Sequence, residues 1–200
     1  MSEPINVTVI PDGPLKISNA GSVSFCGQAL AAEGDLYLCR CGDSSKAPFC
    51  DGTHVKMGFK GSSPDAPEGA IRVWEGKTLR TYFNKTTCMH VFYCKPLKEL
   101  RAREEAGDAE AAVEIMRVVE SCPSGALSYE TKVDLPEPTP PERVAVEIME
   151  GGEIRLQAEF DINAPLQERQ IANKATLCRC SMSKNKPWCD GRHKGRKDFR

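Results

Sequence analysis

The sequence predicts an α+β protein that is mostly β, in which two copies of a small metal-binding unit flank a domain of another kind. The first observation is a repeat, because three cysteines and a histidine occur between residues 39 and 54 and again between residues 178 and 193. The second is a series of short alternating stretches, typical of strands, that precedes each copy. The third is a stretch of helical periodicity over residues 108–122, between the two copies.

Composition excludes several classes of function. The 27 basic and 28 acidic side chains nearly cancel, so no global field favours nucleic acid or an anionic membrane. No apolar run reaches the length of about 18 residues that a membrane span needs. The N-terminus has no targeting pattern, and ten cysteines without a signal peptide indicate metal ligands in a reducing compartment. We therefore expect a soluble cytoplasmic protein that binds neither nucleic acid nor membrane.

The first unit, which we place at residues 1–65, begins with strand-like pieces separated by turns. Residues 36–38 lead directly into Cys39, which we expect at the end of a strand. Cys41 lies two positions further, Cys50 follows a polar loop, and His54 comes four residues later. Thiolates and imidazoles are the ligands of zinc and of iron–sulfur clusters, so the four residues predict a metal site.

The second unit, at residues 143–200, repeats this pattern 139 positions later. The recurring ligands are Cys178, Cys180, Cys189 and His193. Before them, an alternating stretch turns at Gly151–Gly152, which predicts a hairpin. An Asp-Gly pair also recurs, and we expect Asp51 and Asp190 each to cap a short helix at its N-terminus.

The spacing of the ligands favours a diiron cluster. Structural zinc sites usually take cysteine pairs spaced by two to four residues, whereas these pairs are separated by one. Two ligands followed by two more suit a cluster in which each iron takes two protein ligands. A zinc site with three cysteines and one histidine stays open at this point.

Both copies fit the pattern Cys-x-Cys-x2-Ser-x3-Pro-x-Cys-Asp-Gly-x-His, and thereby resemble the CDGSH iron–sulfur (mitoNEET-like) family. Ser44 and Pro48 complete the first copy, and Ser183 and Pro187 complete the second. The resemblance implies two [2Fe–2S] clusters. It also implies that the closely spaced cysteines, Cys39 with Cys41 and Cys178 with Cys180, would each bind an inner iron. The later pairs, Cys50 with His54 and Cys189 with His193, would each bind an outer iron.

The resemblance also implies a β-cap shared by the two units. Members with a single motif form two-fold dimers, so two motifs in one chain predict an intramolecular pseudo-dimer and a monomeric protein. The residue before the ligating histidine is Thr53 in one copy and Arg192 in the other. Because like charges repel, we expect Arg192 to disfavour protonation of His193, and the first cluster to be lost sooner in acid.

The middle region, residues 70–132, resembles a divergent single-cluster ferredoxin domain. It contains a predicted hairpin around Gly76–Lys77, a predicted helix capped by Asp108, and a Cys-Pro-Ser-Gly run that begins at Cys122. Its candidate ligands are Cys88, Cys94 and Cys122. Val91 occupies the position of a missing ligand, so we expect a scaffold that has lost its cluster. A [3Fe–4S] cluster, or a [4Fe–4S] cluster with His90 as fourth ligand, stays open. We expect Cys26, outside all three ligand sets, to be buried on a strand.

Residues 133–142 contain four prolines and predict an extended linker. No nucleophile–base pair or phosphate-binding loop stands out, so we expect no enzymatic activity. The leading interpretation is electron transfer, with cluster donation as an added role. The partner would be a redox protein or an apo-protein that accepts a cluster. The alternative is a pH or redox sensor, or a scaffold, whose labile clusters are the signal. The basic tail, Arg192, Lys194, Arg196, Lys197 and Arg200, is either a docking surface for an acidic partner or a solvated surface.

Overall fold

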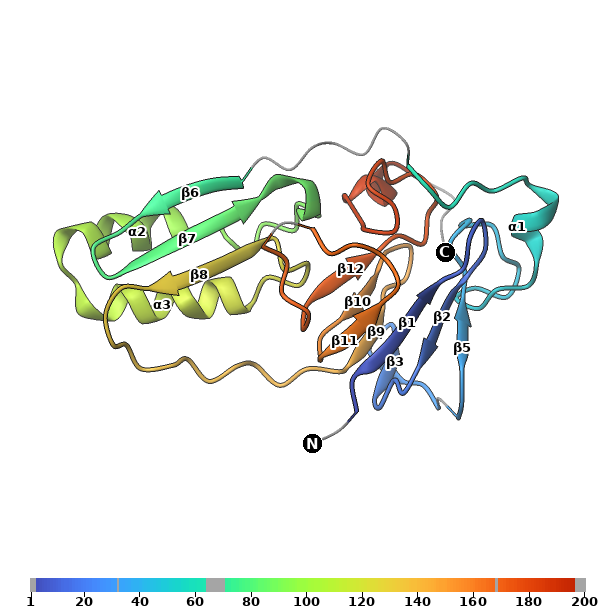
Figure 1. Ribbon diagram of the computed structural model, residues 1–200, viewed down its shortest axis with the longest axis horizontal. Helices are drawn as coiled ribbons and strands as arrows, with labels where there is room; N and C mark the ends of the chain where they lie inside the picture. Colours follow the sequence, from blue (N-terminus) through green and yellow to red (C-terminus); the bar gives the residue numbers. More distant parts are fainter. Residues whose placement is uncertain (1–2, 32, 64–70, 168, 197–200) are drawn as a thin grey trace.

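The computed structural model describes residues 3–31, 33–63, 71–167 and 169–196. It confirms an α+β fold that is mostly β, with three sheets and few helices (Figure 1). The first sheet has the order β11-β1-β2-β5 and the second the order β12-β10-β9-β3-β4, with β6-β7-β8 forming the third. No described helix is long and apolar enough to cross a membrane.

The strands are β1 (Ile5–Val9), β2 (Leu15–Ser18), β3 (Val23–Phe25), β4 (Gln28–Ala29), β5 (Leu36–Leu38), β6 (Ile71–Glu75), β7 (Leu79–Asn84), β8 (Leu127–Thr131), β9 (Val146–Ile148), β10 (Ile154–Leu156), β11 (Phe160–Ile162) and β12 (Ala175–Leu177). The helices are α1 (Thr53–Lys56), α2 (Leu97–Ala106) and α3 (Ala109–Glu120), with 3-10 turns η1 (Lys85–Thr87) and η2 (Arg192–Gly195).

Strands of the two metal-binding units pair with each other. Strand β1 of the first unit pairs in parallel with β11 of the second, and β3 of the first pairs in parallel with β9 of the second. The two pairings are equivalent under the repeat. Val7 pairs with Ile162, and the residues 139 positions away from these, Val146 and Val23, also pair with each other. A reciprocal pairing of this kind is the pattern of a two-fold interface. The expected pseudo-dimer with a shared β-cap is therefore present within one chain.

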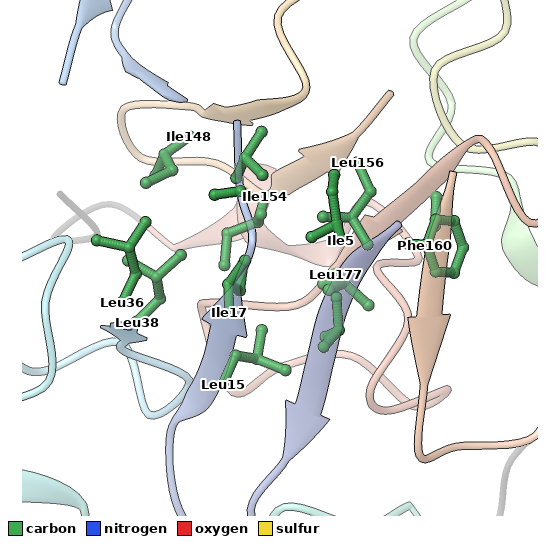
Figure 2. Close-up of a cluster of buried hydrophobic side chains, with 14 of the residues drawn as sticks. Ile5, Leu15, Ile17, Leu36, Leu38, Ile148, Ile154, Leu156, Phe160 and Leu177 are labelled. Carbon is green, nitrogen blue, oxygen red and sulfur yellow. The ribbon is translucent and has the colours of Figure 1, made fainter. Parts of the chain in front are cut away.

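One hydrophobic core lies between the first sheet, β11-β1-β2-β5, and the second, β12-β10-β9-β3-β4 (Figure 2). Leu15 and Ile17 of β2 face Ile154 and Leu156 of β10, and all four side chains are fully buried. Alternation along each strand places these residues on the inner face and their polar neighbours outside. Each unit thus depends on the other for a core that neither could bury alone.

The middle domain packs α2 and α3 against the sheet β6-β7-β8 (Figure 1). The predicted hairpin and helix are confirmed, and the Asp108 carboxylate accepts the Glu110 backbone N–H at 2.9 Å. Ile115 and Val119 of α3 point into the core of this domain. The domain docks on the second unit, where fully buried Lys174 pairs with Glu120 at 2.9 Å.

Candidate metal centres

The two ligand loops are built in the same way. Strand β5 ends directly before Cys39 and β12 directly before Cys178, as the sequence predicts. In each loop the first cysteine's backbone N–H donates to the carbonyl of the motif proline at 2.8 Å, in Pro48 and in Pro187. The motif serines close the loops in addition, since Ser44 Oγ and Ser183 Oγ donate to the carbonyls of Phe49 and Trp188 at 2.5 and 2.6 Å.

The two aspartates do not occupy the predicted capping position. Helix α1 and turn η2 are preceded by Gly52 and Gly191 instead. One carboxylate oxygen of Asp51 accepts the Thr53 N–H at 3.0 Å, and the other accepts the Ser45 N–H at 2.8 Å. Asp190 does the same with the N–H groups of Arg192 and Lys184. Each carboxylate therefore connects the segment between the second and third cysteines to the start of α1 or η2.

Within each motif the ligands form two pairs. The Cys39 and Cys41 Sγ atoms are 3.5 Å apart, and those of Cys178 and Cys180 are 3.8 Å apart. The Cys50 Sγ lies 3.3 Å from Nδ1 of His54, and the Cys189 Sγ lies 3.4 Å from Nδ1 of His193. Two thiolates at about 2.3 Å from one tetrahedral metal lie about 3.8 Å apart. Each pair therefore has the spacing of two ligands on one metal.

The pairs within one motif do not converge on a single ion. Four ligands of one tetrahedral zinc would all lie within about 4 Å of one another. Among the described residues, the one group of three such donors within 4.8 Å of one another is Glu153, Cys189 and His193, which is not three ligands of a motif. The donor set of each motif therefore fits a two-metal centre, with one pair on each metal.

The two centres differ in burial. The first cysteine pair of each motif is buried. In the first centre the outer ligands Cys50 and His54 are only half-buried, whereas Cys189 and His193 in the second centre are buried. The first centre therefore presents its outer pair toward solvent, and the second does not.

Buried Glu153 provides a second difference, which sequence reasoning missed. Its Oε2 atom lies 3.5 Å from Nε2 of His193, and its Oε1 atom accepts Nε–H of Arg155 at 2.7 Å. Since Nδ1 of His193 faces Cys189, the carboxylate approaches the opposite nitrogen, the position from which a second-shell group fixes the tautomer of a metal-binding histidine. The corresponding position in the first unit is Pro14.

The environment of the thiols is strongly perturbed. Burial raises the pKa of the Cys41 thiol to about 11 and raises the pKa of the Cys189 thiol as well. A backbone N–H group opposes the shift of each pKa, that of Asp43 at Cys41 and that of Gly191 at Cys189, whose Sγ it approaches at 3.4 Å. Metal ligation requires thiolates, so a metal cation must supply the charge that the buried site lacks.

Arg192 does not act on His193 as expected. Its guanidinium pairs with Asp190 at 2.8 Å. The pKa of His193 is nevertheless lowered, because burial penalises the charged ring, while the Glu153 carboxylate opposes this shift. Protonation of His193 is therefore disfavoured, as the sequence predicted, but the cause is burial rather than Arg192.

Two buried arginines, one within each Cys-x-Cys pair, also escaped the sequence analysis. Arg40 donates to the carbonyls of Ile10, Gly13 and Gly61, and Arg179 donates to that of Met149. Burial lowers the pKa of both guanidinium groups, and a thiolate of the other motif opposes that shift, Cys178 for Arg40 and Cys39 for Arg179. Each motif thus contributes a buried cation to the surroundings of the other centre.

The middle domain brings its candidate ligands to one narrow cavity. Cys88, His90, Cys94 and Cys122 all line it. The Cys88 Sγ accepts the His90 N–H at 3.4 Å and lies 3.8 Å from Nδ1 of His90. Val91, at the position of the missing ligand, lines the same cavity. Three thiols and one imidazole therefore line the same cavity.

Other residues differ from expectation or lie outside the described part. Cys26 is exposed rather than buried, in the turn that follows β3. Arg192, Lys194 and Arg196 of the basic tail make contacts within the chain. Lys197 and Arg200 lie outside the described residues.

Comparison with known families agrees with this geometry. The family model described as an iron-binding zinc finger of CDGSH type matches residues 12–55 and 142–194. The model described as a divergent 4Fe-4S mono-cluster matches residues 74–132, between them. No curated protein and no solved structure matches the chain.

Proposed function

The chain is an iron–sulfur protein built from two CDGSH-type domains and one divergent mono-cluster domain, and we propose that it carries single electrons on a [2Fe–2S] cluster in each CDGSH-type domain. The observation that carries this proposal is the separation of each motif into two ligand pairs, each spaced for one metal. Cys39 with Cys41 would hold one iron of the first cluster, and Cys50 with His54 the other. The corresponding pairs of the second motif would hold the second cluster.

A [2Fe–2S] cluster supplies one-electron chemistry, and an imidazole in place of a thiolate raises its potential. The chain's own residues act in the same direction. The N–H groups of Gly42 and Gly191 donate to ligand sulfurs, and the buried cations Arg40 and Arg179 lie near the opposite motif. Donors and cations of this kind stabilise the more negative, reduced state, which suits an acceptor of electrons at moderate potential.

We propose in addition that the middle domain holds a third cluster, of the [4Fe–4S] type. This replaces the expectation of an empty scaffold that the sequence alone suggested. Cys88, Cys94 and Cys122 line one cavity together with His90, which would provide the fourth ligand. The match of this region to a mono-cluster family supports the same view.

The partner that we propose is a redox protein that approaches the outer pair of the first centre. Cys50 and His54 are half-buried there, next to Val55, whose side chain is largely exposed. An exposed apolar side chain beside a metal ligand offers a contact to such a partner. Cluster donation to an apo-protein is the second candidate function. The cluster would leave from the first centre, because its outer ligands are half-buried rather than buried.

One experiment separates the two candidates. The reduced and reoxidised protein is mixed with an apo-ferredoxin, and its visible absorbance and iron content are followed. An electron carrier keeps its iron through repeated cycles, whereas a cluster donor loses the absorbance of one centre as the apo-ferredoxin gains it. Loss of iron in acid or under oxidation without transfer would favour a sensor instead.

A further inference from the structure

Arg196 joins the ligand loops of the two CDGSH-type centres. Its Nη1 donates to the carbonyl of Cys41 at 3.2 Å and to that of Cys180 at 2.8 Å. Its Nη2 pairs with Asp43 at 2.5 Å. At Gly42, an added Cβ would meet this guanidinium and would lie 3.2 Å from the Cys180 Cα. The two loops are therefore packed together around the Arg196 side chain.

Lys194 joins the second centre to the middle centre. Its Nζ donates to the carbonyl of Met89 at 3.1 Å and to that of His90 at 2.7 Å. The backbones also touch, since an added Cβ at Gly191 would lie 2.5 Å from the Met89 oxygen. Met89 lies between the candidate ligands Cys88 and His90, and Gly191 lies between Cys189 and His193. The contact therefore joins two ligand loops directly.

The second copy alone provides these two cations. The positions that correspond to Lys194 and Arg196 in the first unit are Val55 and Met57, which are 74% and 52% exposed. Lys194 directly follows the ligand His193, and Arg196 comes three residues after it. Four consecutive residues, 193–196, thus contain a ligand of one centre and the contacts to the other two. Figure 1 shows this part of the chain, in red, between the middle domain and the loop of the first copy.

We propose that segment 193–196 couples metal retention at the three centres, with Lys194 and Arg196 as positioning residues. When His193 is held by its metal, the segment is fixed, and the two cations hold the loops of the middle and first centres in their binding conformations. When the second centre loses its metal, the anchor of both cations is released. Coupling between binding sites is reciprocal, so a filled neighbour also strengthens the second centre. This inference rests on the proposed function, because it concerns retention of the proposed clusters.

Thiol alkylation resolved by residue tests the proposal on the intact, metal-loaded chain. A cysteine that has lost its metal reacts with an alkylating reagent, and peptide mass spectrometry assigns the reaction to one centre. Exposed Cys26 provides an internal measure of full reactivity. The variants are Lys194→Met and Arg196→Met, with Lys184→Met as control, since Lys184 is exposed on the same ligand loop. Lys194→Arg, which keeps a donor, provides a test of rescue.

The expected result is a crossed pattern. Lys194→Met accelerates alkylation of the second and middle centres severalfold and changes the first centre less. Arg196→Met accelerates alkylation of the first and second centres and changes the middle centre less. Lys184→Met changes none of them, and Lys194→Arg restores most of the protection.

Two outcomes would overturn the proposal, and they are distinguishable. If both variants accelerate alkylation only at the second centre, the segment is a local support and the centres are independent, while the proposed function stands. If the wild-type ligand cysteines react as fast before the metal is stripped with acid and a chelator as they do after it, the chain holds no clusters, and the proposed function fails together with the coupling.

Discussion

Oε2 of Glu153 lies 3.5 Å from Nε2 of His193, on the side of the ring that faces away from Cys189. The first unit has Pro14, which carries no carboxylate, at the corresponding position. The two motifs have the same ligands but differ in the residue at the position that places a carboxylate beside Nε2 of His193. The two centres are expected to differ in how firmly they hold their metal.

Replacement of Glu153 by Gln should weaken the second centre selectively. Removal of a group that orients a ligating histidine typically costs about 10- to 100-fold in metal affinity. The visible absorbance lost to a chelator should become biphasic, with the faster phase assigned to the second centre by alkylation of Cys189. The matched control is Glu150→Gln, on the exposed turn next to it. Equal acceleration at both centres would contradict a role for Glu153 at His193.

Acid should release the first cluster before the second. A ligating imidazole must be neutral, and free histidine titrates at about pH 6.5. Burial lowers the pKa of His193, so protons compete for its ring only at lower pH, whereas His54 is half-buried. Both centres should bleach faster between about pH 5 and 6 than at about pH 8, with the first centre leading.

Cysteine variants of the histidines check this order. His54→Cys and His193→Cys, made singly, should each protect one half of the CDGSH absorbance from acid, because a metal-bound thiolate resists protonation more strongly. Bleaching at the wild-type rate in both variants would show that the histidines do not control acid lability.

Replacement of Arg40 by Met should destabilise the fold as well as the centres. The guanidinium is buried and donates to three backbone carbonyls that would lose their partner. Each unsatisfied buried group costs about 1–3 kcal/mol, so the free energy of unfolding in urea should fall by at least about 2 kcal/mol. Exposed Arg72→Met should leave it nearly unchanged. An unchanged midpoint for Arg40→Met would mean that water replaces these contacts.

The chain should be a monomer in solution. Strands β1 and β3 of the first unit already pair with β11 and β9 of the second, so the two-fold cap is completed within one chain. Size-exclusion chromatography with light scattering should give the mass of one chain, 22.0 kDa, at micromolar concentration. A stable particle of twice that mass would indicate that the strands exchange between chains instead.

The local features of the fold follow from local sequence patterns. The ligand spacing, the Gly151–Gly152 turn between β9 and β10, and the apolar face of α3 all depend on residues close together in the chain. The parallel pairing of β1 with β11 joins residues more than 150 positions apart, and no local pattern specifies it. Only the resemblance of the motifs indicated a shared cap.

The parts of the site that the sequence did not predict come from tertiary packing. Glu153 precedes a strand as an ordinary acidic residue, and only the packing of the second ligand loop brings it to His193. The same holds for Arg196, which looks like part of a solvated basic tail until the two loops meet around it. The capping role assigned to Asp51 was wrong because Gly52 occupies the capping position, and Asp51 instead bridges the N–H groups of Thr53 and Ser45.

The central claim, that each motif holds a two-iron cluster, is tested most directly by iron and acid-labile sulfide per chain together with an EPR spectrum of the reduced protein. Two [2Fe–2S] clusters and one [4Fe–4S] cluster predict about eight irons and about eight sulfides, with the EPR signal of a histidine-ligated [2Fe–2S] centre. About four irons with that signal would support the central claim and would show that the middle domain holds no cluster. One zinc per motif, with no colour and no sulfide, would contradict the account.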